Sequence, residues 1–326
     1  MSTLRSRHHH ASTSNSNHTT TASPGHRTPG THTFILPSPH NLGHHVLGYH
    51  IAGATSGSPI FFFHGLPSSR READDFHATA VQQNLCIIGV DRPGVGLSTF
   101  RPGYGLLDWP RDVHALATYL GHDSFRVLGG SGGGPYALAC AYALPKEVLK
   151  GTGVLAGLAP REAGYKGVSW ERYIGFTTNK WLPYWLLHFV IDSGLARHAR
   201  NPDQTHWRKI IVDGMVKRLP ATDQALFDDT AIEAMASQIR DACLGGADGY
   251  VQDAKCVLGK WPFDVGDVRG KVGIWNGTAD TDTPVQGARW MAGRIPGARL
   301  REFEGDSHFS IFVKRQEGIF KELMAL

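Results

Sequence analysis

Cysteine, net charge and long apolar runs are all scarce in this sequence, and each scarcity excludes a class of protein. The four cysteines among 326 residues show no C-x-x-C spacing, so they indicate neither a zinc site nor a disulfide framework. With 33 Lys and Arg against 29 Asp and Glu, the net charge of +4 does not indicate a nucleic-acid-binding protein. The longest nearly uncharged apolar run, 181–191, is shorter than the ~20 residues of a membrane-spanning helix. We therefore expect a globular cytoplasmic protein without stable membrane insertion.

Acidic residues are absent before Glu72, and large apolar side chains are almost absent from residues 1–31. This Ser-, Thr- and His-rich segment cannot bury enough apolar surface to offset the entropy of ordering, so we predict a disordered tail. Organelle targeting is the alternative, because transit peptides are also poor in acid and rich in Ser and Arg. The segment lacks the apolar helical face of a transit peptide and the apolar stretch of a secretory signal.

From residue 32 onward, short apolar runs alternate with amphipathic stretches, which predicts strands and helices in alternation. The predicted strands are 33–36, 45–51, 59–63, 85–90, 125–128, 153–156, 272–275 and 298–303. The predicted helices are 71–83, 107–120, 134–143, 285–293 and 310–324. This order predicts an α/β fold with a mostly parallel eight-stranded sheet and helices on both of its faces.

One long helical and aromatic segment, 159–267, interrupts the alternation. We predict that it is a cap, inserted into a core domain formed by 32–158 and 268–326. Spacings near three and four give one helix of the cap an apolar face, made of Trp181, Tyr184, Trp185 and Phe189. Such a face packs on the core domain or lines a substrate cleft, with Trp181 at the edge of a lid. Membrane contact is the weaker alternative, because the flanking charges are of both signs.

A glycine-rich turn between a predicted strand and a predicted helix carries the strongest chemical signal. Residues 129–134, GGSGGG, contain the pattern G-x-S-x-G around Ser131. A nucleophilic serine in this pattern lies on a turn so sharp that side chains two positions away would clash. The following helix N-terminus favours developing negative charge. Ser131 is therefore a candidate nucleophile; the alternative is a structural turn with a bystander serine.

The same glycines also match the dinucleotide-binding pattern G-x-G-x-x-A. That function requires an acidic residue about 20 positions further on to bind the ribose. The window 151–160 contains neither Asp nor Glu, and no Gly-Lys-Ser/Thr follows to form a phosphate-binding loop. Nucleotide binding is thereby excluded at this turn.

Four motifs in one order resemble those of the alpha/beta-hydrolase superfamily, over residues 32–326. They are HGLP at 64–67, DRPGVGLS at 91–98, the turn at Ser131, and an acid and a histidine near the C-terminus. The resemblance implies a capped serine hydrolase with the chain order serine, acid, histidine. The segment 91–98 is expected to shape a tight turn over the site, with a local pair between its first two residues, Asp and Arg.

A serine hydroxyl needs a histidine base to become nucleophilic near neutral pH, and the base needs a carboxylate. Of the seven histidines beyond residue 64, only His308 follows the last predicted strand, where the family order places the base. His77 and His114 lie on predicted helices, and a solvated or core-edge role is expected for them. His64 ends a predicted strand, and we expect it to connect loops structurally.

Two carboxylates compete for the acid position in the loop after the predicted strand 272–275. Family members commonly have Gly-x-x-Asp-x-x-x-Pro there, and Asp280 fits this spacing between Gly277 and Pro284. We therefore choose Asp280 over Asp282, which is expected to cap the next helix. Asp306 is a weaker candidate, because it lies too close to His308 in a short turn.

Two backbone donors must stabilise the oxyanion of a tetrahedral intermediate. By the resemblance, they are the amides of Leu66 and Gly132. The chain lacks the HGGG motif of one group of lipases and esterases. The Asn276-Gly277-Thr278 sequon beside the acid favours the cytoplasm, because a glycan there would crowd the site.

A serine at this position argues against the aspartate chemistry of epoxide hydrolases and haloalkane dehalogenases. We predict a carboxylesterase-like enzyme that cleaves an ester or related acyl bond of a small, apolar substrate through an acyl-serine, without metal or organic cofactor. Alternatives with the same triad are a carbon–carbon bond hydrolase and an iminopeptidase-like enzyme, whose turn usually has a bulky aromatic residue in place of Gly132. A noncatalytic small-ligand receptor or scaffold is a further alternative. The expected partner is the small-molecule acyl substrate, and the sequence does not determine the oligomeric state.

Overall fold

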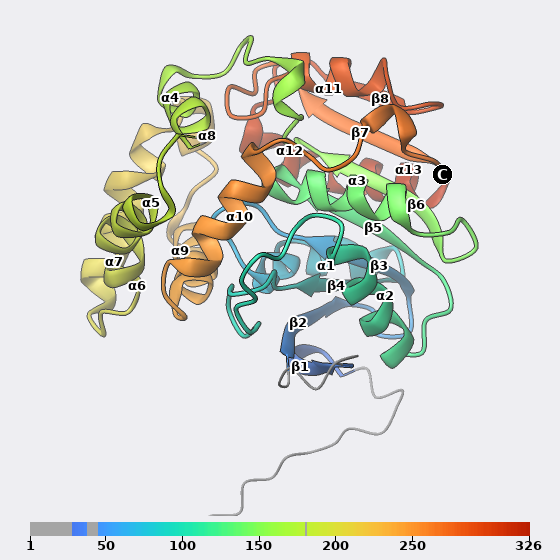
Figure 1. The fold of residues 1–326 in the computed structure, drawn as a ribbon, viewed down its shortest axis with the longest axis horizontal. Coiled ribbons are helices and arrows are strands. Elements are labelled where there is room, and N and C mark those ends of the chain that lie inside the picture. Colours follow the sequence, from blue (N-terminus) through green and yellow to red (C-terminus); the bar gives the residue numbers. More distant parts are fainter. Residues whose placement is uncertain (1–27, 38–44, 180) are drawn as a thin grey trace, which may run out of the picture.

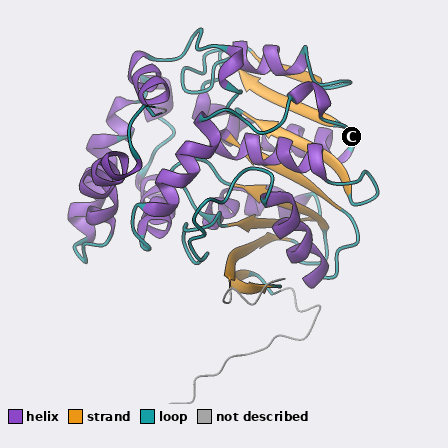
Figure 2. Cartoon of the chain, in the orientation of Figure 1, coloured by secondary structure: helices purple, strands orange, loops and turns teal. Residues whose placement is uncertain are grey.

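One eight-stranded sheet organises the computed structural model, which describes residues 28–37, 45–179 and 181–326 (Figures 1 and 2). The strand order is β1-β2-β4-β3-β5-β6-β7-β8. Strand β2 is antiparallel to both neighbours, and all other neighbouring pairs are parallel. The strands are β1 Gly30–Leu36, β2 His45–Gly53, β3 Ser58–Phe63, β4 Leu85–Val90, β5 Phe125–Gly130, β6 Leu149–Leu155, β7 Val272–Gly277 and β8 Arg299–Phe303. The predicted α/β fold is therefore confirmed.

Strand boundaries differ most from the prediction in β1 and β6. Strand β6 begins at Leu149, before the predicted 153–156, because the apolar run alone did not mark its first residues. Strand β1 begins at Gly30, inside the segment 1–31 predicted as a disordered tail, because it pairs there with the end of β2. Residues 1–27 lie outside the described part of the chain, so the prediction for them stays a prediction.

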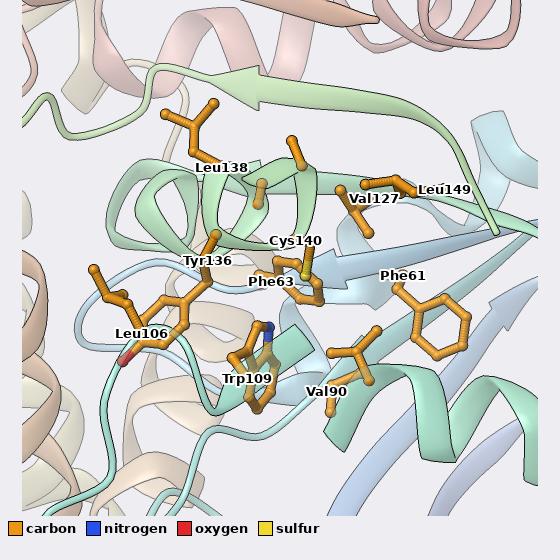
Figure 3. Close-up of a cluster of buried hydrophobic side chains, with 14 of the residues drawn as sticks. Phe61, Phe63, Val90, Leu106, Trp109, Val127, Tyr136, Leu138, Cys140 and Leu149 are labelled. Carbon is orange, nitrogen blue, oxygen red and sulfur yellow. The ribbon is translucent and has the colours of Figure 1, made fainter. Parts of the chain in front are cut away.

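Helices cover both faces of the sheet and bury two apolar cores. One face is covered by α2 Trp109–Tyr119, α3 Gly134–Ala143 and α11 Val285–Ala292. Figure 3 shows part of this core, where Trp109 and Tyr136 lie beside Phe63 of β3. The other face is covered by the 3-10 helix η1 Arg70–Phe76 and by α1 His77–Gln82, α12 His308–Lys314 and α13 Gln316–Met324.

Two predicted helices are interrupted in the structure. The stretch 71–83 starts as the tighter η1 before it continues as α1. The stretch 310–324 forms two helices, separated at Arg315, whose φ of −113° leaves the helical range. The first of these helices begins at His308, so that residue lies at a helix N-terminus rather than in a loop.

The segment 159–267 is mainly helical, and we call it the helical insertion. Figure 1 shows its helices α4 to α9 at one end of the sheet, beyond the carboxyl ends of the parallel strands. They bury a separate apolar core around Trp207, Ile211 and Ile239. The helices are α4 Trp170–Thr178, α5 Tyr184–Ile191, α6 Arg197–Ala199, α7 Gln204–Gly214, α8 Ala221–Gln224, α9 Asp229–Cys243 and α10 Asp248–Leu258. Among the described helices, none combines the length and apolarity that crossing a membrane requires.

The apolar face predicted on Trp181, Tyr184, Trp185 and Phe189 does not pack on the core domain. Helix α5, which carries most of it, contains no buried residue. Trp185 and Phe189 are largely exposed instead. The expectation of core packing is therefore wrong, because spacing identifies an apolar face but not the surface that covers it.

Candidate active site

The carboxyl ends of four parallel strands bring the predicted site residues to one edge of the sheet. Gly65 follows β3, Ser131 follows β5, Asp280 follows β7 and His308 follows β8. A cavity of about 580 Å³ opens at this edge, and both Ser131 and His308 line it. Residues more than 170 positions apart in the sequence thus share one cavity.

Ser131 lies on a sharp turn between β5 and α3. Its φ of 50° is in the left-handed region, which is uncommon for a residue with a side chain. The glycines two positions away are sterically required. A Cβ atom on Gly129 would lie 2.3 Å from the carbonyl oxygen of Gly133, and one on Gly133 would lie 2.0 Å from that of Phe63. The local geometry is thus the one that the G-x-S-x-G pattern predicts.

The two predicted oxyanion donors lie beside each other next to Ser131. A Cβ atom on Gly132 would lie 3.3 Å from the amide nitrogen of Leu66. A Cβ atom on Gly65 would lie 3.6 Å from the Cβ atom of Ser131. The loop after β3 therefore runs close along the serine turn, and a Cβ atom on Gly132 would lie only 2.9 Å from that of Leu66, which is part of the cavity wall.

His308 and Asp280 form a buried, hydrogen-bonded pair. His308 Nδ1 lies 2.8 Å from Asp280 Oδ2. The other carboxylate oxygen, Oδ1, accepts hydrogen bonds of 2.8 Å from the amides of Asp282 and Thr283. The hydroxyl of Thr283 lies 2.9 Å from Oδ2 and 3.1 Å from His308 Nδ1, so it packs into the same pair. The carboxylate is held from several sides, which fixes the orientation of the imidazole.

Asp282 occupies a different place from the one predicted. The residue before α11 is Pro284, which provides no side-chain cap, so the prediction that Asp282 caps this helix is wrong. Asp282 instead accepts two hydrogen bonds, of 3.1 and 3.0 Å, from the guanidinium of Arg172 on α4. The planar guanidinium matches both carboxylate oxygens, and this geometry outcompetes a helix cap. Asp306 does not contact His308; it accepts from Arg315 Nε at 2.6 Å.

The electrostatic surroundings of His308 favour its charged form. Burial lowers the pKa of the imidazole, but the charge and hydrogen bond of Asp280 outweigh burial and raise the pKa to about 9. Asp282 raises this pKa further and Arg172 lowers it. Asp280 therefore supplies most of the stabilisation of a protonated His308.

A buried network behind the loop after β3 was not predicted. The predicted pair between Asp91 and Arg92 is wrong, because each residue pairs elsewhere. Asp91 pairs with Arg70 at 2.8 Å, and Arg92 pairs with Asp253 of α10 at 2.6 Å. Adjacent residues of an extended chain point in opposite directions, which separates the two side chains.

Arg92 also supports the loop that carries Leu66. Its guanidinium donates to the carbonyl oxygens of His64 at 2.7 Å and Gly65 at 2.9 Å. His64 itself is fully buried, bonds Gly65 O through Nδ1, and is not among the residues that line the cavity. Burial lowers the pKa of His64 well below its usual value, which keeps it neutral. A structural role suits this position better than catalysis.

Because Arg92 is buried with its partner, we expect Arg92→Met to lower the free energy of unfolding by about 3–5 kcal/mol. The side chains of Arg92 and Asp253 are 1% and 2% exposed, so removing one charge leaves the other buried and unpaired. Urea denaturation followed by circular dichroism measures this change. Arg289→Met is the matched control, since its pair with Glu302 lies at the surface and should leave the midpoint almost unchanged. Equal midpoints for Arg92→Met and wild type would contradict a stabilising role of the buried pair between Arg92 and Asp253.

Two carboxyl groups of η1, Glu72 and Asp75, also line the cavity and were not predicted from the sequence. Glu72 Oε2 accepts a hydrogen bond of 2.8 Å from the amide of Gly65. Burial raises the pKa of Glu72, and burial together with the charge of Glu72 raises that of Asp75 to about 7. Glu72 lies in the first turn of η1, where acids are common, so the sequence held no signal for its place in the cavity wall.

The helical insertion supplies much of the remaining wall. Its side chains there are mainly apolar, and the polar ones are those of Arg172, Asp228, Thr230 and Gln238. The aromatic residues predicted for the cleft edge, Trp181 among them, are not among those that line the cavity. The wall contains instead Met215, Leu226, Phe227, Ala231, Ala234, Met235 and Ile239 of the insertion, opposite Phe76, Phe309, Phe312 and Val313.

Comparisons with known proteins agree with this architecture. The family model of the alpha/beta hydrolase fold matches residues 58–315. The structure is similar to an esterase from Thermogutta terrifontis, with a TM-score of 0.63 and 18% identity over 90% of this chain and 98% of that chain. No curated protein sequence matches the chain.

Other solved structures share the architecture with different recorded activities. An esterase from Rhodococcus sp. aligns with a TM-score of 0.59 and 16% identity, over 86% of this chain and 94% of that chain. A bromoperoxidase from Bacillus anthracis aligns with a TM-score of 0.61 and 16% identity, over 87% of this chain and 96% of that chain. At this level of identity the likeness shows the fold alone, and the function must be argued from the site.

Proposed function

This chain belongs to the alpha/beta hydrolase fold family, and we propose that it is a serine hydrolase that cleaves an ester or related acyl bond of a small, apolar substrate. One observation carries the proposal. The buried His308–Asp280 pair and the strained Ser131 come from separate strands and reach the same cavity. A structural turn would require neither the buried pair nor its shared access to the cavity.

The proposed reaction proceeds through an acyl-serine. The Ser131 oxygen attacks the acyl carbon while His308 Nε2 takes the serine proton, and Asp280 stabilises the resulting imidazolium. The amides of Leu66 and Gly132 stabilise the negative oxygen of the tetrahedral intermediate. Collapse of this intermediate breaks the bond to the leaving group, which takes the proton from His308. Water, deprotonated by His308, then attacks the acyl-serine; the bond to the serine oxygen breaks, this oxygen takes the proton from His308, and the acid is released.

The cavity supports a substrate that is small and mainly apolar. A volume of about 580 Å³ lies within the usual range of small-molecule pockets, and most of its wall is apolar. The pKa of Asp75, raised to about 7 by burial and the charge of Glu72, reduces the negative charge of the remaining wall near neutral pH. None of the four cysteines, which all lie in the described part of the chain, forms a disulfide, and this supports activity in a reducing compartment such as the cytoplasm.

Turnover of short p-nitrophenyl esters by the purified full-length chain tests this proposal. We expect measurable kcat/KM for the butyrate or hexanoate ester, because the apolar wall can bind the acyl chain. A well-folded chain that binds such esters without cleaving them would instead support a noncatalytic small-ligand receptor.

The pH dependence provides a further prediction. Only neutral His308 can accept the serine proton, and its pKa is raised to about 9. We therefore expect kcat/KM to increase with pH and to reach half its maximum near pH 9. The other charged groups near the ring are Asp282, Arg172, Asp223 and Glu72.

The contribution of Asp280 to this pH profile can be separated. In Asp280→Asn the charge that raises the pKa of His308 is gone, so the midpoint should move to lower pH while the maximum rate falls. Initial rates with a neutral ester, extrapolated to zero buffer, give both profiles. A wild-type kcat/KM that stays constant up to about pH 9 would show that His308 is not the titrating base.

A further inference from the structure

The helical insertion contacts the chain directly before and directly after His308. On one side, Asp223 of α8 accepts a hydrogen bond from the hydroxyl of Ser307. On the other side, the ring of Phe227 packs edge to face against that of Phe309, with the ring centroids 5.2 Å apart. His308 is thus flanked by two contacts with the insertion.

The contact with Ser307 is made by a buried carboxyl group. Asp223 is only 2% exposed, and its hydrogen-bond partner is a neutral hydroxyl rather than a cation. Burial raises the pKa of this carboxyl, whereas the hydrogen bond from Ser307 and the charge of His308 lower it. Burial of a carboxylate is unfavourable unless a hydrogen bond or an opposite charge compensates it. Both compensating groups lie at the start of α12.

The hydrogen bond to Asp223 determines how Ser307 caps α12. Ser307 directly precedes the helix, and its oxygen accepts a hydrogen bond of 3.3 Å from the amide of Ser310. In return, the Ser310 hydroxyl accepts one of 2.8 Å from the amide of Ser307. A hydroxyl group has one proton, and Asp223 accepts it, so the lone pairs of the oxygen stay directed at the helix. The carboxylate therefore fixes the first turn of α12, which begins with His308.

A further contact of the insertion fixes the loop of the acid. Arg172 of α4 bonds both carboxylate oxygens of Asp282, whose amide donates to Asp280 Oδ1 at 2.8 Å. The insertion therefore reaches both members of the His308–Asp280 pair through residues one or two positions away from them. These polar contacts are not needed to form the cavity wall, because the apolar side chains of the insertion supply most of its share.

We propose that Asp223 is a positioning residue for His308, the base of the reaction. Through Ser307 it fixes the first turn of α12, and this turn holds the imidazole within reach of Asp280 and Ser131. The inference rests on the proposed function, since it concerns the proton transfer of that reaction. A displacement of about 1 Å between reacting groups can cost about 10²-fold in rate. The insertion thereby becomes part of the catalytic machinery, in addition to forming a wall of the cavity.

A role in stability alone would have a different kinetic signature. In that case the bond between Asp223 and Ser307 would only attach the insertion to the core domain. Its loss would lower the stability and would change KM, because the neighbouring Leu226 and Phe227 line the cavity. Loss of a positioning contact instead lowers kcat, because proton transfer is impaired after the substrate has bound.

Steady-state kinetics of Asp223→Ala and Asp223→Asn with a p-nitrophenyl ester test the proposal. We expect Asp223→Ala to lower kcat by about 10–100-fold and to leave KM within about threefold of wild type. Asparagine has nearly the same size, and its amide oxygen can accept the hydrogen bond from Ser307, so Asp223→Asn should restore most of the lost kcat. The rate at which a fluorophosphonate labels Ser131 should fall and recover in the same order, because labelling requires the base.

Asp203→Ala is the matched control, because Asp203 is an aspartate of the insertion with a structural role outside the cavity wall. It caps α7 by accepting hydrogen bonds of 3.0 and 3.2 Å from the amides of Thr205 and His206. Its removal should lower the melting temperature and change kcat by no more than about twofold. Circular dichroism checks the fold of each variant. If Asp223→Ala does not fold, Ser307→Gly removes the same hydrogen bond, and glycine is tolerated at a helix N-cap.

A wild-type kcat in Asp223→Ala would overturn the inference, and so would an Asp203→Ala variant that is equally slow. An Asp223→Asn variant as slow as Asp223→Ala would also overturn it, because loss of the hydrogen bond would then not be the cause. Failure of the proposed function gives a different result, in which wild type neither cleaves the ester nor is labelled at Ser131. The inference would then fall together with the proposed function.

Discussion

Ser131→Ala should lower kcat/KM for a p-nitrophenyl ester by at least about 10⁴-fold. The alanine lacks the oxygen that forms the acyl bond, so only the oxyanion donors and substrate binding remain to accelerate hydrolysis. The fold should be retained, because alanine has a smaller side chain than serine at the same backbone angle. Purified wild type and variant are compared by initial rates, after thermal unfolding has shown similar melting temperatures.

The control for this variant is Ser193→Ala in the insertion. The Ser193 hydroxyl donates a hydrogen bond only to carbonyl oxygens of its own helical segment, among those that the structure describes. We expect its kcat/KM to stay within about twofold of wild type, as for most surface substitutions. Ser131→Ala with more than a tenth of the wild-type rate would contradict the assignment of Ser131 as the nucleophile.

Asp280→Asn should lower kcat by about 10³–10⁴-fold. Asparagine keeps the size of the side chain but removes the charge that stabilises protonated His308, and its amide favours the wrong tautomer of the imidazole. Asp280 is also the acceptor for Thr283 and for two amides, so the variant requires a folding control by circular dichroism.

Asp282→Asn is the matched comparison, because it changes the neighbouring carboxylate in the same loop. Asp282 bonds Arg172 and reaches His308 only through its charge, so we expect less than a tenfold loss in kcat. The reverse order, with the larger loss in Asp282→Asn, would show that the wrong acid has been assigned. The two kcat values decide which of the two carboxylates is the acid. Both are measured at one pH above 9, where His308 is neutral in wild type.

Local chemical requirements made the centre of the site predictable from sequence. The glycines around Ser131 are needed because a Cβ atom at 129 or 133 would overlap backbone. The spacing that selected Asp280 over Asp282 also selects the carboxylate that bonds His308. Both features depend on a few adjacent residues, and short motifs record such constraints directly. Their catalytic roles remain predictions that the variants above test.

Long-range partners could not be predicted in the same way. Arg92 bonds Asp253 and Arg172 bonds Asp282 across the packed fold, more than a hundred positions apart in each case. A lone arginine or aspartate in the sequence carries no information about such a partner. The prediction of a local pair between Asp91 and Arg92 was wrong for this reason, because proximity in sequence was the only criterion for choosing a partner.

Apolar periodicity had a similar limit. It placed the strands and most helices of the core domain, where the sheet offers a surface for every apolar face. On α5 the same signal predicted that Trp185 and Phe189 pack on the core domain or line the cleft, and both are largely exposed and absent from the cavity wall. The pattern indicates that a face avoids water, whereas the identity of the covering surface depends on the assembled molecule.

The most direct test of the central claim is labelling with a fluorophosphonate probe, followed by mass spectrometry of the digested protein. The probe reacts with a serine only when a base removes its proton, so it reports an activated nucleophile without knowledge of the natural substrate. We predict one adduct, on Ser131, that is absent in Ser131→Ala and strongly slowed in His308→Ala. A folded wild type without an adduct, or with the adduct on another serine, would contradict the assignment of this chain as a Ser131 hydrolase.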